Sequence, residues 1–225
     1  MFNMKKFWWK ILTIIILSYT IIGGLLFEVP RLVILNESVR NLYFHVPMWG
    51  AMLTLLTVSM VYSIKYLTGQ DMKMDIRAVE FANGGILFGI LGLATGMMWA
   101  TYTWGEPWSG DPKQNSSAIA MLIYLAYMVL RNSLDDEQQK GRISAIYNIF
   151  AFAALIPLLF ILPRMAESSL HPGNGSNPGF DSYDYDSKLR IIFYPAVIGW
   201  TLLGVWITTL KVRMKEISYK LKNDL

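Results

Sequence analysis

The stretch ISAIYNIFAFAALIPLLFIL, residues 143–162, contains 20 residues and no charged side chain. A helix of about 20 apolar residues is long enough to cross the hydrocarbon core of a bilayer. Because lipid offers no hydrogen-bond partners to open backbone groups, a segment of this kind must be helical there. The stretch therefore predicts a transmembrane helix and places the chain among membrane proteins.

Five more apolar segments lie at about 7–27, 46–67, 81–101, 116–130 and 189–210. Segment 116–130 is short, and we expect its polar start at the interface or against neighbouring helices. The composition agrees, with 54% hydrophobic and 16% charged residues, against about 25% charged in soluble domains. The sequence therefore predicts an all-α integral membrane protein with six transmembrane helices, forming one domain over residues 1–225.

The distribution of basic residues predicts the orientation. With the N-terminus inside and six spans, cytoplasmic segments hold 14 of the 20 Lys and Arg residues and outer loops hold 6. This bias follows the positive-inside rule. Without span 116–130 the basic tail 211–222 would lie outside, so its charge favours six spans. We expect both termini in the cytoplasm, and polar solvated connectors at 71–77 and 135–142.

Missing residues and motifs exclude several functions. The chain has no cysteine, which rules out disulfides, thiolate metal ligands and covalent heme attachment through CxxCH. No Walker motif is present, so this chain does not itself hydrolyse ATP. The net charge of +4 is explained by membrane orientation, so nucleic acid is not an expected partner.

The three outer loops carry the distinctive residues. In the first, about 28–44, Leu32, Leu35, Val39 and Leu42 form an apolar stripe that predicts an amphipathic helix lying flat at the interface. The second is WGEPWSGDP, 104–112, a short connector with two tryptophans. The third, about 163–188, is rich in Gly, Asn, Ser and Pro and predicts irregular structure.

The only two histidines, His45 and His171, fall on the same outer side of this topology. His45 precedes Pro47, a residue favoured in first helical turns, and is expected at the outer mouth of the second span. Heme is flat and apolar on both faces, and imidazole is a common axial ligand of its iron. Two histidines and a set of tryptophans at one membrane surface therefore suggest a heme site.

In such a site, Trp99, Trp104 and Trp108 could pack along the macrocycle, because indole offers a large rigid apolar surface. Basic residues of the outer side could pair with the propionates; the candidates are Arg31, Arg40, Lys113, Arg164, Lys188 and Arg190.

Simpler interpretations stand beside this one. Tryptophans at a membrane–water boundary are typical belt residues. A histidine near a helix end often only makes hydrogen bonds at the interface. Asp111 before Pro112 is a typical start signal for a helix, with Asp111 as its cap.

At these residues the chain resembles a known family. The stretch GMMWATYTWGEPWSGDPKQNSSAIAMLIYLAYMVLR, 96–131, resembles the tryptophan-rich segment of the CcmC/CcmF/CcsA cytochrome c assembly proteins. HVPMWGAM (45–52), SLHPGNGSNPGF (169–180) and YPAVIGWTLLGVW (194–206) look most like the CcmC, or heme exporter protein C, group. Two positions depart from the family pattern: Gly110 stands where a tryptophan is usual, and Asn115 where a threonine is common.

The resemblance implies a function. Such proteins hold heme b, non-covalently and transiently, at the periplasmic face of the bacterial inner membrane, with His45 and His171 as axial ligands. The tryptophan-rich segment would contact the heme edge and a CcmE-like heme chaperone; it carries over to Trp104, Gly105, Trp108 and Asp111. CcmA, CcmB and CcmD-like proteins, an ABC-type complex, are the implied further partners, and the chain itself would not be an enzyme.

Three other functions are alternatives. A CcsA-type cytochrome c synthase would usually be longer and have more histidines. A heme b electron-transfer subunit would place its histidines within the spans. A small-solute transporter would carry ionisable residues inside its spans, and this chain has few of them there.

Overall fold

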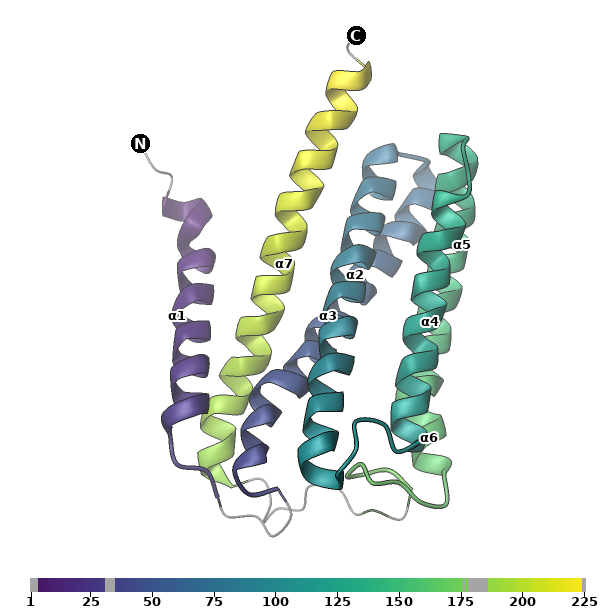
Figure 1. The fold of residues 1–225 in the computed structure, drawn as a ribbon. Helices are drawn as coiled ribbons and strands as arrows, with labels where there is room; N and C mark the ends of the chain where they lie inside the picture. The colour runs from purple at the N-terminus through teal and green to yellow at the C-terminus, as the bar shows by residue number, and fades with distance from the viewer. Residues whose placement is uncertain (1–3, 31–34, 176, 178–185, 224–225) are drawn as a thin grey trace.

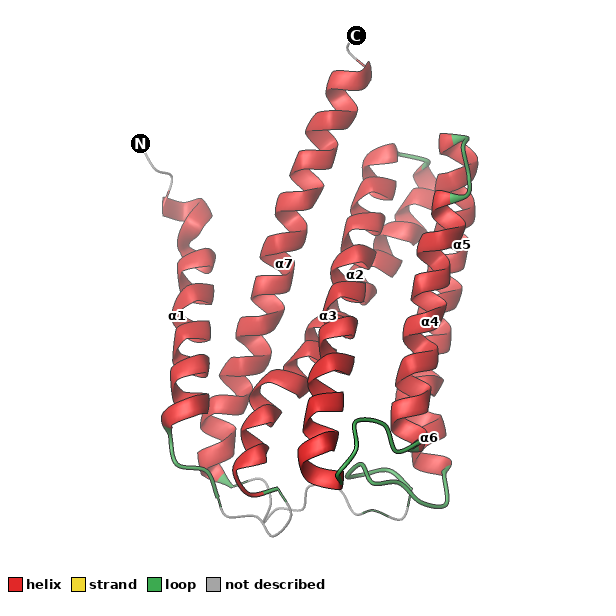
Figure 2. Cartoon of the chain, in the orientation of Figure 1, coloured by secondary structure: helices red, strands yellow, loops and turns green. Residues whose placement is uncertain are grey.

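The computed structural model describes residues 4–30, 35–175, 177 and 186–223. Within this part of the chain every regular element is a helix, and no strand occurs (Figure 2). The elements are α1 (Met4–Leu26), the 3₁₀ helix η1 (Asn36–Asn41), α2 (Leu42–Gly69), α3 (Met72–Trp104), α4 (Pro112–Asn132), α5 (Glu137–Ile156), the π-helical η2 (Pro157–Ile161), α6 (Leu162–Met165) and α7 (Ser187–Asn223).

The long helices form one bundle with two distinct ends (Figure 1). The start of α1 and the end of α7 lie together at one end, which we call the terminal end. The connections before η1, between α3 and α4, and after α6 lie at the other, which we call the loop end. Helix α2 is central and packs on α3, α5 and α7, while α1 packs on α7 and α4 mainly on α5.

Five helical stretches are long and apolar enough to cross a membrane: Phe7–Leu26, Asn36–Gly69, Met72–Trp104, Glu137–Met165 and Ser187–Lys222. The all-helical membrane class predicted from the sequence is therefore confirmed. A helix also forms at the fourth predicted span, as α4, but its first turn carries Lys113, Gln114 and Asn115, and it is not among the five. The sixth span and the orientation in the membrane stay predictions.

The polar connectors predicted at 71–77 and 135–142 are shorter in the structure, because most of their residues are helical. Helix α3 begins at Met72, where the Asp71 carboxylate accepts a hydrogen bond from the Lys73 backbone N–H at 2.9 Å. Helix α5 begins at Glu137, where Asp136 caps the Gln139 N–H at 2.7 Å. Side-chain capping, and not the end of the apolar run, determines where these helices start.

The predicted amphipathic helix of the first outer loop is also corrected. Leu32 lies outside the described residues, and the 3₁₀ helix η1 runs directly into α2. Val39 and Leu42 are 0% and 1% exposed and pack with Leu189 and Ile192 of α7. This stripe is covered by the chain's own C-terminal helix, so it does not face lipid. In the third loop, the described residues between α6 and α7 are irregular as predicted.

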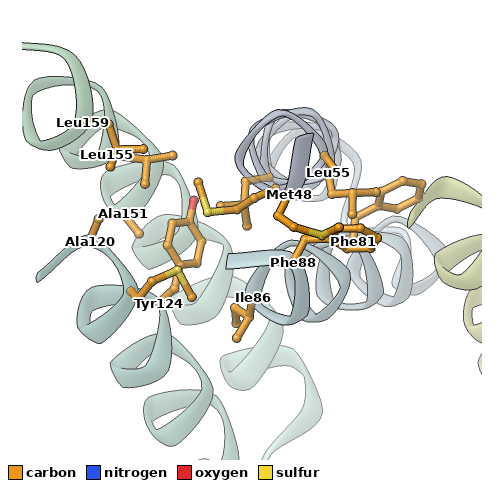
Figure 3. Packing of buried hydrophobic residues seen from close by; sticks show 14 of the residues in the cluster. Met48, Leu55, Phe81, Ile86, Phe88, Ala120, Tyr124, Ala151, Leu155 and Leu159 are labelled. Carbon is orange, nitrogen blue, oxygen red and sulfur yellow. The ribbon is translucent and has the colours of Figure 1, made fainter. Parts of the chain in front are cut away.

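The main core lies between α2, α3, α4 and α5 (Figure 3). Glycines on α3 allow a close approach to its neighbours: a methyl group added at Gly85 would lie 2.5 Å from Cδ2 of Leu56. The same face of α3 carries Gly92 and Gly96 nearer the loop end. This close α2–α3 contact brings the first turns of α2, with His45, onto the surface of α3.

Candidate histidine and tryptophan site

His45 lies in the first turns of α2, with its ring against α3. Its Nδ1 is 3.0 Å from the Gly92 carbonyl oxygen and 3.3 Å from Oγ1 of Thr95. A carbonyl can only accept, so Nδ1 must carry the proton and donate. The Thr95 hydroxyl donates to the Leu91 carbonyl at 2.8 Å and can also accept. Nε2 of His45 is therefore left with its lone pair.

His171, in the connection after α6, is fixed in the same way by a different acceptor. Its Nδ1 lies 2.8 Å from Oδ1 of Asp111, and a carboxylate accepts this N–H. Burial lowers the pKa of His171 below its usual value, although the Asp111 charge opposes that shift. The imidazole is thus neutral at pH 7 with its lone pair on Nε2.

The two histidines consequently share one tautomer. Within the described residues, neither Nε2 makes a hydrogen bond. Metal-binding histidines typically anchor the second ring nitrogen on a carbonyl or carboxylate in this way. The described residues contain no group of three or more His, Cys, Asp or Glu side chains that could hold a metal ion.

Asp111 joins the two loops of the site. It caps α4 by accepting from the Lys113 N–H at 2.8 Å, as the Asp-Pro signal predicts. Its second oxygen accepts from the Ser169 hydroxyl at 2.8 Å and from the Leu170 N–H at 2.6 Å. Burial raises the pKa of Asp111, but these hydrogen bonds and His171 outweigh burial, and the pKa is lowered. The carboxylate is therefore charged, and Asp111 both caps α4 and holds the His171 ring.

Tryptophan rings lie beside both histidines. The ring centroid of Trp104 lies 4.8 Å from that of His171, and that of Trp99 lies 5.8 Å from His45, both edge-on. Trp49, which is not among the predicted site residues, has its ring centroid 6.3 Å from that of His45. Trp108 is 37% exposed. Each imidazole is thus bordered by at least one indole, and Trp108 is left at the surface.

Indole N–H groups also have partners. Trp99 donates from Nε1 to the Ser38 hydroxyl at 3.1 Å, which fixes its ring against η1. A membrane-belt tryptophan would direct this group to water or headgroups. Trp99 is therefore an internal packing residue of the site.

The loop 105–111 owes its shape to backbone conformation and to the first turn of α4. Gly105 ends α3 with a φ of 90°, and Gly110 has a φ of 73°, both in the left-handed region that favours glycine. Gln114 accepts from the Ser109 N–H at 3.0 Å and donates to the Pro107 carbonyl at 3.2 Å.

Asn115 donates to the Gly110 carbonyl at 2.8 Å. Neither Gln114 nor Asn115 was predicted to shape the loop; the polar pair that follows Asp-Pro-Lys was the available signal. At Gly110 no atom lies within 4 Å of an added Cβ, but the φ of 73° would strain any side chain placed there.

Of the six basic candidates, Lys113 lies in the first turn of α4, two residues after Asp111, and Arg164 lies in α6. The charge of Lys113 acts on both rings, and its ammonium donates to the Leu159 carbonyl. Burial, followed by the neighbouring Arg164, lowers the pKa of Lys113 to about 8. Arg40 instead binds Gly24, Phe27 and Glu37, and Lys188 pairs with Glu28; Arg31 is outside the described residues.

The His45 ring packs directly against Gly96, and a substitution at Gly96 tests this contact. A methyl group added there would lie 2.6 Å from Cε1 of His45, a distance that side-chain carbons do not tolerate. We expect Gly96→Ala to displace the imidazole and weaken hemin binding about tenfold, the scale of a lost orienting contact, measured by Soret titration. Gly69→Ala is the control, because no atom lies within 4 Å of the new Cβ. Equal hemin affinities for the two variants would contradict the packing of His45 on Gly96.

The fold and the site define a class: a multi-helix membrane protein with two lone-pair-bearing histidines and a tryptophan loop at one end of its bundle. The family model of CcmC, heme exporter protein C, matches residues 1–223, and the chain belongs to this family.

Comparison with individual relatives supports the same family. The chain is 22% identical over 223 residues to heme exporter protein C of Rhodobacter capsulatus, covering 96% of this chain and 88% of the relative. It is 23% identical over 188 residues to that of Bradyrhizobium diazoefficiens, covering 84% and 70%. Cytochrome c biogenesis protein CcsA of Pelargonium hortorum is 33% identical over 92 residues, which cover 40% of this chain and 29% of the relative.

Proposed function

We propose that this protein handles heme for cytochrome c maturation, holding heme b between His45 and His171 and passing it to a CcmE-like heme chaperone. The observation that carries the proposal is the shared tautomer of the two histidines. Each donates its Nδ1–H to a fixed acceptor, Gly92 or Asp111, and leaves Nε2 free to bind iron. Membership of the heme exporter protein C family supports the same function.

The residues present fit heme better than a bare metal ion. Heme iron already has four nitrogen ligands and needs only one or two axial groups, which is what two histidines can supply. The indoles of Trp99 and Trp104 border the imidazoles and would cover an apolar macrocycle. Lys113 and Arg164 provide positive charge for the propionates. Without cysteine, the chain has no thiol to bond the vinyl groups, so binding is non-covalent and reversible.

The two histidines are held by different kinds of structure, and from this we infer the order in which they release the heme. His45 belongs to a long helix and is packed against α3. His171 belongs to a loop and depends on the hydrogen bonds to Asp111 for its position. The exposed ring of Trp108 lies on the loop that precedes Asp111, and we place the chaperone there. Docking that shifts this loop would release the His171 bond first, while His45 still holds the heme.

The site is proposed to face the periplasm, with the terminal end in the cytoplasm, because the terminal end carries most Lys and Arg residues. The remaining partners are proposed to be CcmA, CcmB and CcmD-like proteins. The family name indicates a transport or delivery component, and we propose that the chain is not itself an enzyme.

The test is a hemin titration of the full-length protein in lipid nanodiscs, followed by absorption spectroscopy. We expect a low-spin Soret spectrum for the unmodified chain. His45→Ala and His171→Ala should each convert bound heme to a five-coordinate, high-spin form that added imidazole returns to low spin. Trp8→Ala, at a side chain 62% exposed near the terminal end, is the control. An unchanged spectrum in both histidine variants would show that the ligands lie elsewhere.

A second candidate, a component of a CcsA-type synthase, is favoured by the 33% identity to CcsA over 92 residues. A synthase would yield covalent cytochrome c when the heme-loaded protein is incubated with a reduced CxxCH peptide. Transfer of heme to a chaperone without thioether formation is the outcome expected for the delivery function.

A further inference from the structure

The end of α7 carries an apolar stripe that nothing in the described chain covers. Leu210, Met214, Ile217 and Leu221 are spaced by four, three and four residues and are 43%, 68%, 58% and 62% exposed. This spacing places them on one face of the helix, and it is the a/d spacing that packs one helix against another. We call these four residues the α7 stripe.

The α7 stripe continues an interface that the chain already uses. Closer to the middle of α7, the same face is covered by α1: Gly199 lies against Ile16 and Leu17, and Trp206 lies 6.1 Å from Trp9. Trp206 precedes Leu210 by one helical turn. Helix α1 begins at Met4, and α7 extends beyond it at the terminal end (Figure 1). A helix in the position of α1, shifted toward the terminal end, would cover the stripe.

Lipid is a poor occupant of this stripe, because α7 is fixed to the bundle. On its other side, Glu216 pairs with Arg77 at 2.9 Å, and Lys222 pairs with Glu137 at 2.8 Å. These contacts join the end of α7 to α3 and α5. At 1.5 Å per residue, Ile217 and Leu221 lie roughly 10 and 16 Å beyond Leu210, the predicted end of the span.

The charged residues beside the α7 stripe indicate the kind of partner that it binds. On a helical wheel the α7 stripe is flanked by Lys211 on one side and by Arg213 and Lys220 on the other, whereas Glu216 is turned toward Arg77. A second copy of this chain would bring the same basic flanks together and be repelled. We propose that the α7 stripe docks an acidic amphipathic helix of a partner protein at the terminal end of the bundle.

The test uses a chain that is naturally free of cysteine, so one nitroxide can be placed cleanly. Ile217→Cys is spin-labelled in the full-length protein, in phosphatidylethanolamine–phosphatidylglycerol vesicles. The probe is a synthetic helix of about four heptads, with Leu at a and d and Glu at e and g. A peptide with Lys in place of Glu is the charge control, and a label at the exposed Gln138→Cys is the position control.

We expect the label at 217 to be accessible to a water-soluble relaxation agent and to become immobilised by the acidic peptide. The basic peptide should bind at least tenfold more weakly, and the label at 138 should not respond. Combining Met214→Gln with Leu221→Gln, or Lys211→Glu with Lys220→Glu, should abolish the response. The Soret titration is independent of this readout, so the docking surface can fail while the heme site stands.

Three results would overturn the proposal. Preferential collision with oxygen would show that lipid covers position 217. Spin–spin broadening without peptide would show a second copy of the chain. Equal binding of the acidic and basic peptides would show that charge does not select the partner.

Discussion

Asp111→Ala should destabilise the protein by about 3 kcal/mol and weaken hemin binding by about 10- to 100-fold. Asp111 is 5% exposed and accepts hydrogen bonds from four donors, in Lys113, Ser169, Leu170 and His171. Loss of a helix cap costs about 1 kcal/mol, and each buried donor left without an acceptor costs about 1–3 kcal/mol. Loss of a group that orients a metal ligand typically costs 10–100-fold in affinity.

The measurements are the free energy of unfolding in mixed detergent–SDS micelles and hemin affinity by Soret titration. Hydrogen exchange at Leu170 should also rise, since its N–H loses its acceptor. Asp136→Ala is the matched control: Asp136 caps α5 by one hydrogen bond to the Gln139 N–H and is exposed. It should cost about 1 kcal/mol and leave heme binding unchanged. If Asp111→Ala behaves like this control, Asp111 is a helix cap only.

Asp75→Ala should destabilise the protein by about 3–5 kcal/mol, because it leaves the largely buried charge of Arg131 without a partner. The guanidinium of Arg131 binds the Asp75 carboxylate through two hydrogen bonds, at 2.9 and 2.6 Å. The two side chains are 16% and 4% exposed. Since α4 packs mainly on α5, this pair is the strong polar link between α3 and α4 at the terminal end.

Unfolding in mixed micelles measures this effect as well. The Arg77–Glu216 pair offers the control, because its side chains are 33% and 23% exposed, and Glu216→Gln should cost no more than about 1 kcal/mol. Replacing both partners, Asp75→Leu with Arg131→Met, should recover most of the loss, since an apolar pair leaves no buried charge. A double variant as unstable as Asp75→Ala would instead point to a packing role for these positions.

Sequence patterns predicted the helices well and their ends poorly. A long apolar run identifies a span because lipid forces its backbone into a helix, and this holds for the five stretches found. The ends were misplaced at α3 and α5 because Asp71 and Asp136 start these helices within polar sequence. Likewise, Val39 and Leu42 showed helical periodicity, but only the packing of α7 shows that they face the protein and not the membrane.

For the site, the groups available for chemistry follow from the sequence alone: the chain has no cysteine. Its two histidines and the tryptophan loop between them were predicted to lie on one side of the membrane. Chain composition and span topology are local or additive properties, and they can be read without knowing any contact. Tertiary structure decided which nitrogen of each histidine is free. The acceptors, the Gly92 carbonyl and the Asp111 carboxylate, are 47 and 60 residues away in the chain, and only the packing of α2 on α3, and of the loop after α6 on the start of α4, brings them within hydrogen-bond distance.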